Sequence, residues 1–200
     1  MIWQDKGFLL HQSAFGERSF LVTFLTENHG RCRALCRIGN RATFVSGSTY
    51  DIAWTSRLED NLGTFSLDTP YGPVWTMIHH PGALRALNLM CFICTNIVPE
   101  RVAMPHLFAI FGETLEQLAT PNGLRAYDAF ETGLFQELGY DPVDRNPGTT
   151  LWERLEYRHQ DYVTHWPNLH RLHRMRQGFL SDIGTILAPK ARAGSVSLIR

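Results

Sequence analysis

The residues best suited to chemistry in this chain are four arginines near its N-terminus. They are Arg31, Arg33, Arg37 and Arg41, and no acidic residue occurs between Asn28 and Tyr50. Same-face residues of a β-strand lie about 6–7 Å apart, and the planar guanidinium group suits phosphate recognition. The spacing would therefore allow a track for a nucleic-acid backbone along one strand. Further basic residues that could extend it are Lys6, Arg18 and Arg57.

The alternative to a phosphate track is an ordinary solvated strand face. Residues 1–70 carry seven basic and seven acidic side chains, and the whole chain carries nineteen of each. The pattern alone therefore favours the solvated face. Residues 71–150 are acidic and residues 151–200 basic, so separate regions could approach partners of opposite charge.

Cysteine and histidine spacings raise the question of a metal site. Cys91 and Cys94 have ligand spacing, and together with Cys32 and Cys36 they could form a four-thiolate zinc site. Cys91 and Cys94 lie in an apolar run, however, where free cysteine acts as a small hydrophobe. His170 and His173 have helical spacing, but arginines adjoin them and disfavour a bound cation. We therefore expect packed thiols, a solvated basic helix face and no cofactor.

Sequence signatures of enzymes are missing. The chain has no glycine-rich loop ending in Gly-Lys-Ser/Thr, no Gly-x-Ser-x-Gly and no His-Glu-x-x-His. Its carboxylates are scattered along the sequence. We expect a protein that is not an enzyme, with a site assembled from distant residues as the alternative.

The arginines require a strand to position them, and residues 1–75 predict a barrel of five. Strands are expected at Gly7–Leu10, Ser19–Thr26, Arg31–Ile38, Tyr50–Trp54 and Leu62–Asp68. In the third strand, cysteine and alanine alternate with outward arginines. Gly30 can take the positive φ that the preceding turn needs. Five short, evenly spaced strands are typical of an OB-fold, and Trp54 and Phe65 are expected in its core.

From residue 76 to residue 190 the hydrophobic period becomes helical, so the fold class is α+β with two domains. Helices are expected at Ala83–Val98, Pro105–Leu118, Leu124–Leu138, Thr150–Gln160 and Asn168–Leu187. Gly139 suits a helix C-cap, and Thr150 with Glu153 fits a capping box. Residues 191–200 are expected to form a flexible tail.

The N-terminus does not have the pattern of a signal peptide, since no basic region precedes a long apolar run. The most apolar stretch, residues 84–98, is too short to span a bilayer. These features favour a cytoplasmic protein.

Three N-terminal segments resemble the bacterial recombination mediator family RecO. They are Trp3–Gly7, Phe15–Ser19 and Leu25–Arg31, the last ending in the family's His-Gly-Arg turn. A later Phe-Glu…Leu-Gly-Tyr signature is matched by Phe130-Glu131 and Leu138–Tyr140. The motifs run in the family's order from Met1 to Tyr140, and together they are specific.

The resemblance implies an N-terminal OB-fold, a helical C-terminal domain and no catalysis. It implies binding of single- and double-stranded DNA, annealing of complementary strands and binding of the acidic tail of single-strand-binding protein. With RecR, such a protein helps to load RecA, which places it in the bacterial cytoplasm with the nucleoid. The arginines of the third strand then become candidate DNA contacts.

The chain departs from the family pattern at two places. The segment Arg37–Arg41 is less basic than the family's Arg-Gly-Ala-Arg loop, with Asn40 where a basic residue is frequent. Residues 141–146 contain no cysteine where many members carry a zinc module, so the resemblance implies no zinc here. From Thr150 onward the match to the family is poor.

Because the segment Arg37–Arg41 is only weakly basic, two alternatives to a DNA-binding mediator remain. One is a protein-interaction adaptor whose barrel has lost DNA binding, and the other is an RNA-binding OB protein. A docking groove for the acidic tail would need a basic rim in the helical domain. Candidate rim residues are Arg101, Arg125, Arg171 and Arg174.

Overall fold

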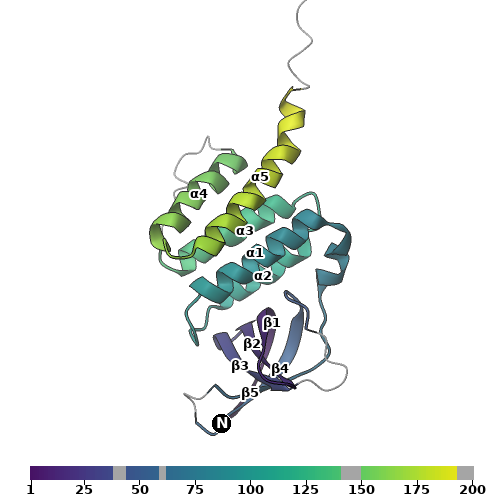
Figure 1. The fold of residues 1–200 in the computed structure, drawn as a ribbon, viewed down its shortest axis with the longest axis vertical. Coiled ribbons are helices and arrows are strands. Elements are labelled where there is room, and N and C mark those ends of the chain that lie inside the picture. Colours follow the sequence, from purple (N-terminus) through teal and green to yellow (C-terminus); the bar gives the residue numbers. More distant parts are fainter. Residues whose placement is uncertain (38–43, 59–61, 141–149, 193–200) are drawn as a thin grey trace, which may run out of the picture. The chain divides into compact units, whose positions relative to one another are not determined.

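The computed structural model describes residues 1–37, 44–58, 62–140 and 150–192. The chain divides into two compact units, Met1–Asp141 and Pro142–Arg200. The first contains the strands and the helices that follow them, and the second is a pair of helices (Figure 1).

The first unit begins with a closed five-stranded barrel. Its strands are β1 (Ile2–Ala14), β2 (Ser19–Thr26), β3 (Gly30–Arg37), β4 (Thr49–Thr55) and β5 (Thr64–Leu67). They close in the order β1-β2-β3-β5-β4, and only β3 and β5 pair in parallel. The predicted OB-fold is confirmed.

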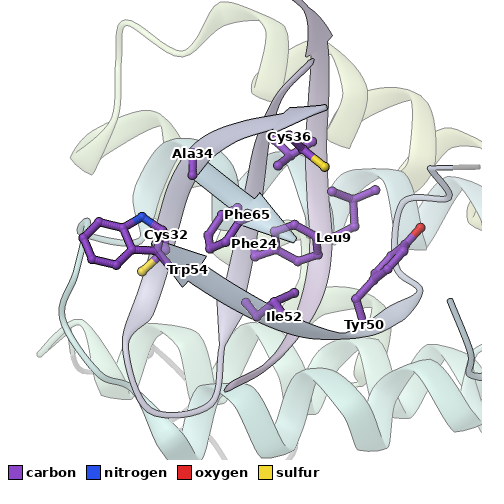
Figure 2. Packing of buried hydrophobic residues seen from close by; sticks show 10 residues of the cluster. Leu9, Phe24, Cys32, Ala34, Cys36, Tyr50, Ile52, Trp54 and Phe65 are labelled. Atoms are coloured by element: carbon purple, nitrogen blue, oxygen red, sulfur yellow. The ribbon is translucent and has the colours of Figure 1, made fainter. Parts of the chain in front are cut away.

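The barrel core follows from the alternation of small and apolar residues along the strands. On β3 it takes in Cys32, Ala34 and Cys36, each at most 6% exposed. In Figure 2 the rings of Trp54 and Tyr50, both from β4, lie at opposite ends of this cluster. The expectation that Trp54 and Phe65 belong to the core is confirmed, and Gly30 has the expected positive φ of 68°.

Strand β1 is much longer than the four residues expected for it. Residues 7–10 are all buried, because both of its faces are covered in that stretch. Leu9 points into the barrel, whereas Phe8 packs outward against Phe108 and Phe111, at ring centroid distances of 4.7 and 5.0 Å. The strand therefore lacks the alternation by which half-buried strands are recognised.

A short 3-10 helix and three α-helices complete the first unit. They are η1 (Pro73–His79), α1 (Pro81–Ile97), α2 (Pro105–Gln117) and α3 (Gly123–Glu137). The segment that forms η1 is not among the helices expected from the sequence. Gly139 has φ 79°, as its expected role at the end of a helix requires. The expected boundary between domains at residues 75 and 76 lies inside this compact unit, and it stays a prediction.

The second unit consists of α4 (Leu151–His165) and α5 (His170–Arg192). The predicted capping box is present: Thr150 accepts from the backbone N–H of Glu153, whose carboxylate accepts from Thr150 in return. Arg176 is wholly buried and donates from Nη1 to the carbonyl oxygen of Leu155 at 2.8 Å. Of the expected tail, residues 191 and 192 are helical, and residues 193–200 lie outside the described part. No helix in the described ranges is long and apolar enough to cross a membrane.

Candidate nucleic-acid interface

The alternation along β3 turns its arginines away from the barrel core. Arg33 and Arg37 are exposed, whereas Arg31 and Leu35 between and beside them are only half-buried. Across the strand pair, Thr23 lies opposite Arg33, and Ser19 lies opposite Arg37. The predicted outward face of the third strand is confirmed, but its arginines do not have equal access to solvent.

The guanidinium group of Arg31 contacts other groups within the protein. Its Nε donates to the carbonyl oxygen of Val98 at 2.6 Å, and its Nη1 lies 3.1 Å from Oε1 of Glu100. Its side chain is 16% exposed, against 49% for Arg33. Arg33 is within 3.8 Å of the same carboxylate, through its Nε. Arg31 therefore links β3 to the connection between α1 and α2. Arg33 has the carboxylate of Glu100 near its guanidinium group.

The remaining basic candidates lie at different places on the barrel. Arg18 is exposed in the β1–β2 turn, one residue before Ser19, and so at the same barrel end as Arg37. Arg57 is exposed just after β4, at the opposite end. Lys6 lies opposite Asp51 in the β1–β4 pair, in a hollow lined by several acidic residues. Arg18 and Arg37 therefore lie at the same end of the barrel, whereas Lys6 lies elsewhere on it. Arg41 lies outside the described residues.

A second group of candidate residues surrounds a hollow of about 280 Å³ at the end of the barrel where β1 and β3 begin. We call it the barrel-end hollow. Its walls include Trp3, His29, Arg33, Trp54 and Arg101. The rings of Trp3 and His29 are stacked, with centroids 4.0 Å apart and planes inclined by 9°. The ring of Trp54 is also stacked with that of Trp3, with centroids 5.5 Å apart.

Asp5 fixes the position of His29 in this stack. Its carboxylate is 1% exposed and accepts hydrogen bonds from the backbone of Lys6 and from the backbone and side chain of Asn28. His29 Nδ1 lies 2.7 Å from its Oδ2. Burial alone would raise the pKa of Asp5, but these hydrogen bonds outweigh it and hold the pKa below the ordinary value of 3.8. An ionised carboxylate only accepts, so Nδ1 is the donor and Nε2 is the ring nitrogen left for a ligand.

Arg101 reaches the barrel-end hollow from the α1–α2 connection. Its backbone N–H donates to the carbonyl oxygen of Arg31 at 3.0 Å, beside a β-bridge between Arg31 and Glu100. Its φ is 57°, and no other non-glycine residue in the described ranges has a positive φ. An arginine held in this conformation is strained by about 1–3 kcal/mol. The expected rim residue of the helical domain is thus placed beside Arg33 of the barrel.

The other three rim candidates are exposed on helices. Arg125 lies on α3, and Arg171 and Arg174 lie three residues apart on α5. None of the three lines the barrel-end hollow.

All four cysteines are buried as free thiols. Burial raises the pKa of Cys91 to about 12 and that of Cys32 to about 11. Cys91 lies in α1 with its Sγ 4.0 Å from the carbonyl oxygen of Leu9. Within the described ranges, no three His, Cys, Asp or Glu side chains are grouped so as to hold a metal ion.

The barrel-end hollow is not predicted by the sequence pattern. In the sequence, Trp3 belongs to a family motif, His29 to a turn and Trp54 to the expected core. Their meeting depends on the register of β1 against β2 and β4, in which Gly7 lies opposite Thr26 and Trp3 opposite Trp54. The one local signal is an aromatic residue at the start of a strand, and such residues are common in barrels that have no site there.

Comparison with known proteins relates the chain to a family. Residues 1–68 match the family described as "Recombination protein O N terminal". The chain is 31% identical over 145 residues to "DNA repair protein RecO" of Ruegeria sp. (strain TM1040), covering 70% of this chain and 60% of that protein. It is 32% identical over 147 residues to the protein of that name from Hyphomonas neptunium, with the same two shares. For Gluconacetobacter diazotrophicus the identity is 30% over 150 residues, covering 70% and 59%. The chain spans about 60% of the length of these curated relatives.

Proposed function

Because this chain is a relative of the DNA repair proteins RecO, with residues 1–68 forming the N-terminal domain of that family, we propose that it binds single- and double-stranded DNA and anneals complementary strands. The proposal places the contact on the outer face of β3. It involves phosphate neutralisation and no chemical step, so the protein acts without being an enzyme.

The observation that carries the proposal is the outward direction of Arg33 and Arg37 on a strand whose other face is packed in the core. A closed barrel is rigid, so the backbone positions from which these side chains project are fixed before DNA arrives. Arg18 in the β1–β2 turn extends the path beyond Arg37. Loops between strands β1 and β2 commonly flank the binding face of OB-folds.

The number of available arginines sets how steeply DNA affinity is expected to fall with salt concentration. For single strands, log K falls with log salt concentration by about 0.7 for each phosphate neutralised. Contacts by Arg18, Arg33 and Arg37 would give a slope of about −2. Arg31 is omitted because its guanidinium is engaged by Val98 and Glu100.

The experiment is a salt titration of binding to labelled single-stranded DNA, followed by fluorescence anisotropy. Replacing Arg33 and Arg37 together by alanine should reduce the slope by about 1.4. Arg85→Ala, which removes an exposed arginine from α1, is the matched control and should keep the parent slope. Equal slopes for the parent and the double variant would show that β3 is not the DNA contact.

We extend the proposal to the partners that the family suggests. With RecR and single-strand-binding protein, the chain would assist the loading of RecA on DNA near the bacterial nucleoid. Arg101, Arg125, Arg171 and Arg174 are the candidate contacts for the acidic tail of single-strand-binding protein. Titrating a peptide of that tail against single alanine variants tests each of them, and a loss of affinity is expected at the true rim.

One observation favours the second candidate function, a protein-interaction adaptor. Glu100 lies near both Arg31 and Arg33 and offsets part of the positive charge at that end of β3. A gel-shift assay with labelled single-stranded DNA separates the two functions, because an adaptor would leave the DNA unshifted and still bind its protein partners.

A further inference from the structure

We infer that the barrel-end hollow binds one nucleotide of a DNA strand, with its base on the Trp3–His29 stack and its phosphate held by Arg33 and Arg101. The inference rests on the proposed function. It adds a contact to a base, which phosphate contacts along β3 alone would not provide. The residues that carry it come from four segments: the start of β1, the turn before β3, β3 itself and the α1–α2 connection.

The first argument is the open aromatic surface. His29 is stacked on Trp3 with ring centroids 4.0 Å apart, and Trp54 is stacked on Trp3 at 5.5 Å. The side chain of His29 is nevertheless 37% exposed, so the stack ends in solvent at the hollow. Aromatic side chains of OB-folds provide such platforms for unstacked bases, with little preference among the bases.

The second argument is that the end of the stack is held in position. Asp5 is buried, accepts from three donors in the segments next to it and contacts His29 Nδ1 at 2.7 Å. This fixes the plane of the imidazole and directs Nε2 away from the carboxylate. A ring that served only to cover the barrel end would not require such a network.

The third argument is the pair of arginines at the same hollow. Arg33 points outward from β3, and Arg101 lines the same hollow from the α1–α2 connection, in a left-handed backbone conformation. Backbone strain of this kind persists where surrounding structure enforces it, and it concentrates at binding sites. Glu100 adjoins Arg33 at 3.8 Å, so the phosphate would have to compete with one carboxylate.

The size of the hollow limits the choice of ligand. At about 280 Å³ it lies just below the range of roughly 300–1,000 Å³ for sites of drug-sized ligands. One nucleotide is therefore a better fit than a folded peptide. A peptide carboxylate could use the arginines, but the peptide would also need an aromatic side chain next to it to occupy the stack.

Quenching of tryptophan fluorescence by deoxyadenosine monophosphate tests the inference, with inorganic phosphate as the comparison ligand. We expect the nucleotide to quench the parent protein and to do so less in Trp3→Phe, since Trp3 is the nearest reporter. Arg101→Asn should bind the nucleotide roughly tenfold more weakly, the effect of losing one charged hydrogen bond. Asparagine tolerates the left-handed region, so the backbone conformation at this position should be kept, and thermal unfolding checks that the variant is folded. Arg85→Ala, which removes an exposed arginine from α1, is the control and should bind as the parent does.

Three results overturn the inference, and they separate it from the proposed function. If the parent binds a short oligothymidylate but the nucleotide does not quench it, the hollow is not a nucleotide site and DNA binding stands. The same follows if Arg101→Asn binds both probes as the parent does, or if inorganic phosphate displaces the nucleotide at the nucleotide's own concentration. If the parent binds neither probe, both proposals are wrong.

Discussion

Arg31 and Val98 are 67 residues apart in the chain, yet the Nε of Arg31 lies 2.6 Å from the carbonyl oxygen of Val98. The first half of β3 is not paired with β5, since the β3–β5 ladder includes only Leu35 and Cys36 of β3. Residues Glu100 and Arg101 occupy that edge instead, through the bridge and the backbone hydrogen bond to Arg31. Covering an unpaired strand edge in this way joins the barrel to its helices.

Replacing Arg31 by alanine should therefore reduce stability rather than act mainly on DNA binding. Val98 is buried, so its carbonyl group would lose its partner. Hydrogen bonds to charged groups contribute about 1.5–3 kcal/mol, and we expect a decrease of that order in the free energy of unfolding. Urea denaturation followed by circular dichroism measures it.

Arg33→Ala is the matched control for Arg31→Ala, because it removes an exposed arginine two residues along the same strand. Its cost should stay within about 0.5 kcal/mol, as for other surface substitutions. Equal destabilisation by the two variants would show that Arg31 has no special structural role.

The Asp5 carboxylate should stabilise the barrel in a pH-dependent manner. Its folded pKa lies below the unfolded value because hydrogen bonds from His29, Asn28 and Lys6 outweigh the effect of burial. The unfolded chain therefore binds more protons as pH falls below about 3.8, and the stabilisation present above that pH is lost. Asp5→Asn should cost about 1–3 kcal/mol at neutral pH, because its amide group cannot accept all of these bonds.

Unfolding of the parent and of Asp5→Asn by urea at several pH values checks this prediction. The difference in free energy should be constant near neutral pH and should shrink as pH falls through the folded pKa. A difference that does not change with pH would assign the effect to side-chain packing.

Gly30 should tolerate no side chain, for two separate reasons. Its φ is 68°, and a Cβ atom there would collide with the carbonyl oxygen of Val102. Gly16 has a similar φ of 76° but has no atom within 4 Å of that position. Gly16→Ala should thus cost about 1 kcal/mol for the backbone alone, and Gly30→Ala about 1–3 kcal/mol more for the collision.

Thermal unfolding of the two glycine variants provides the comparison. Similar losses in both would mean that the segment around Val102 moves away at little cost. In that case the edge of β3 is less firmly covered than the contacts of Arg31 indicate.

The buried thiols should be unreactive while the protein is folded. Burial raises the pKa of Cys91 to about 12 and that of Cys32 to about 11, so almost no thiolate is present at neutral pH. Labelling with iodoacetamide at neutral pH should modify none of the four cysteines within the time in which the unfolded chain is fully labelled. Mass spectrometry before and after adding denaturant measures this, and rapid labelling of Cys91 in the folded protein would contradict its burial in α1.

Features that depend on neighbours in the sequence were predictable, because they are imposed by backbone geometry. The two-residue period of β3 separated Cys32, Ala34 and Cys36 from the outward arginines. The capping box of Thr150 and Glu153 involves residues three apart, and Gly139 and Gly30 have the backbone conformations expected of them. The closed OB topology followed from five strands that had to bury one face each, and the family motifs agreed with it.

Features that depend on distant segments were decided by packing. Arg31 and Arg33 have the same position in the strand period, and only the α1–α2 connection makes one a structural residue and leaves the other half-exposed. The length of β1 was hidden because helices cover the outer face at Phe8 and remove the alternation. The barrel-end hollow joins Trp3, His29 and Arg101, which come together only through strand register and the bridge to β3. Periodicity reports which face of an element a side chain lies on, but the partner that meets that face is set by the whole fold.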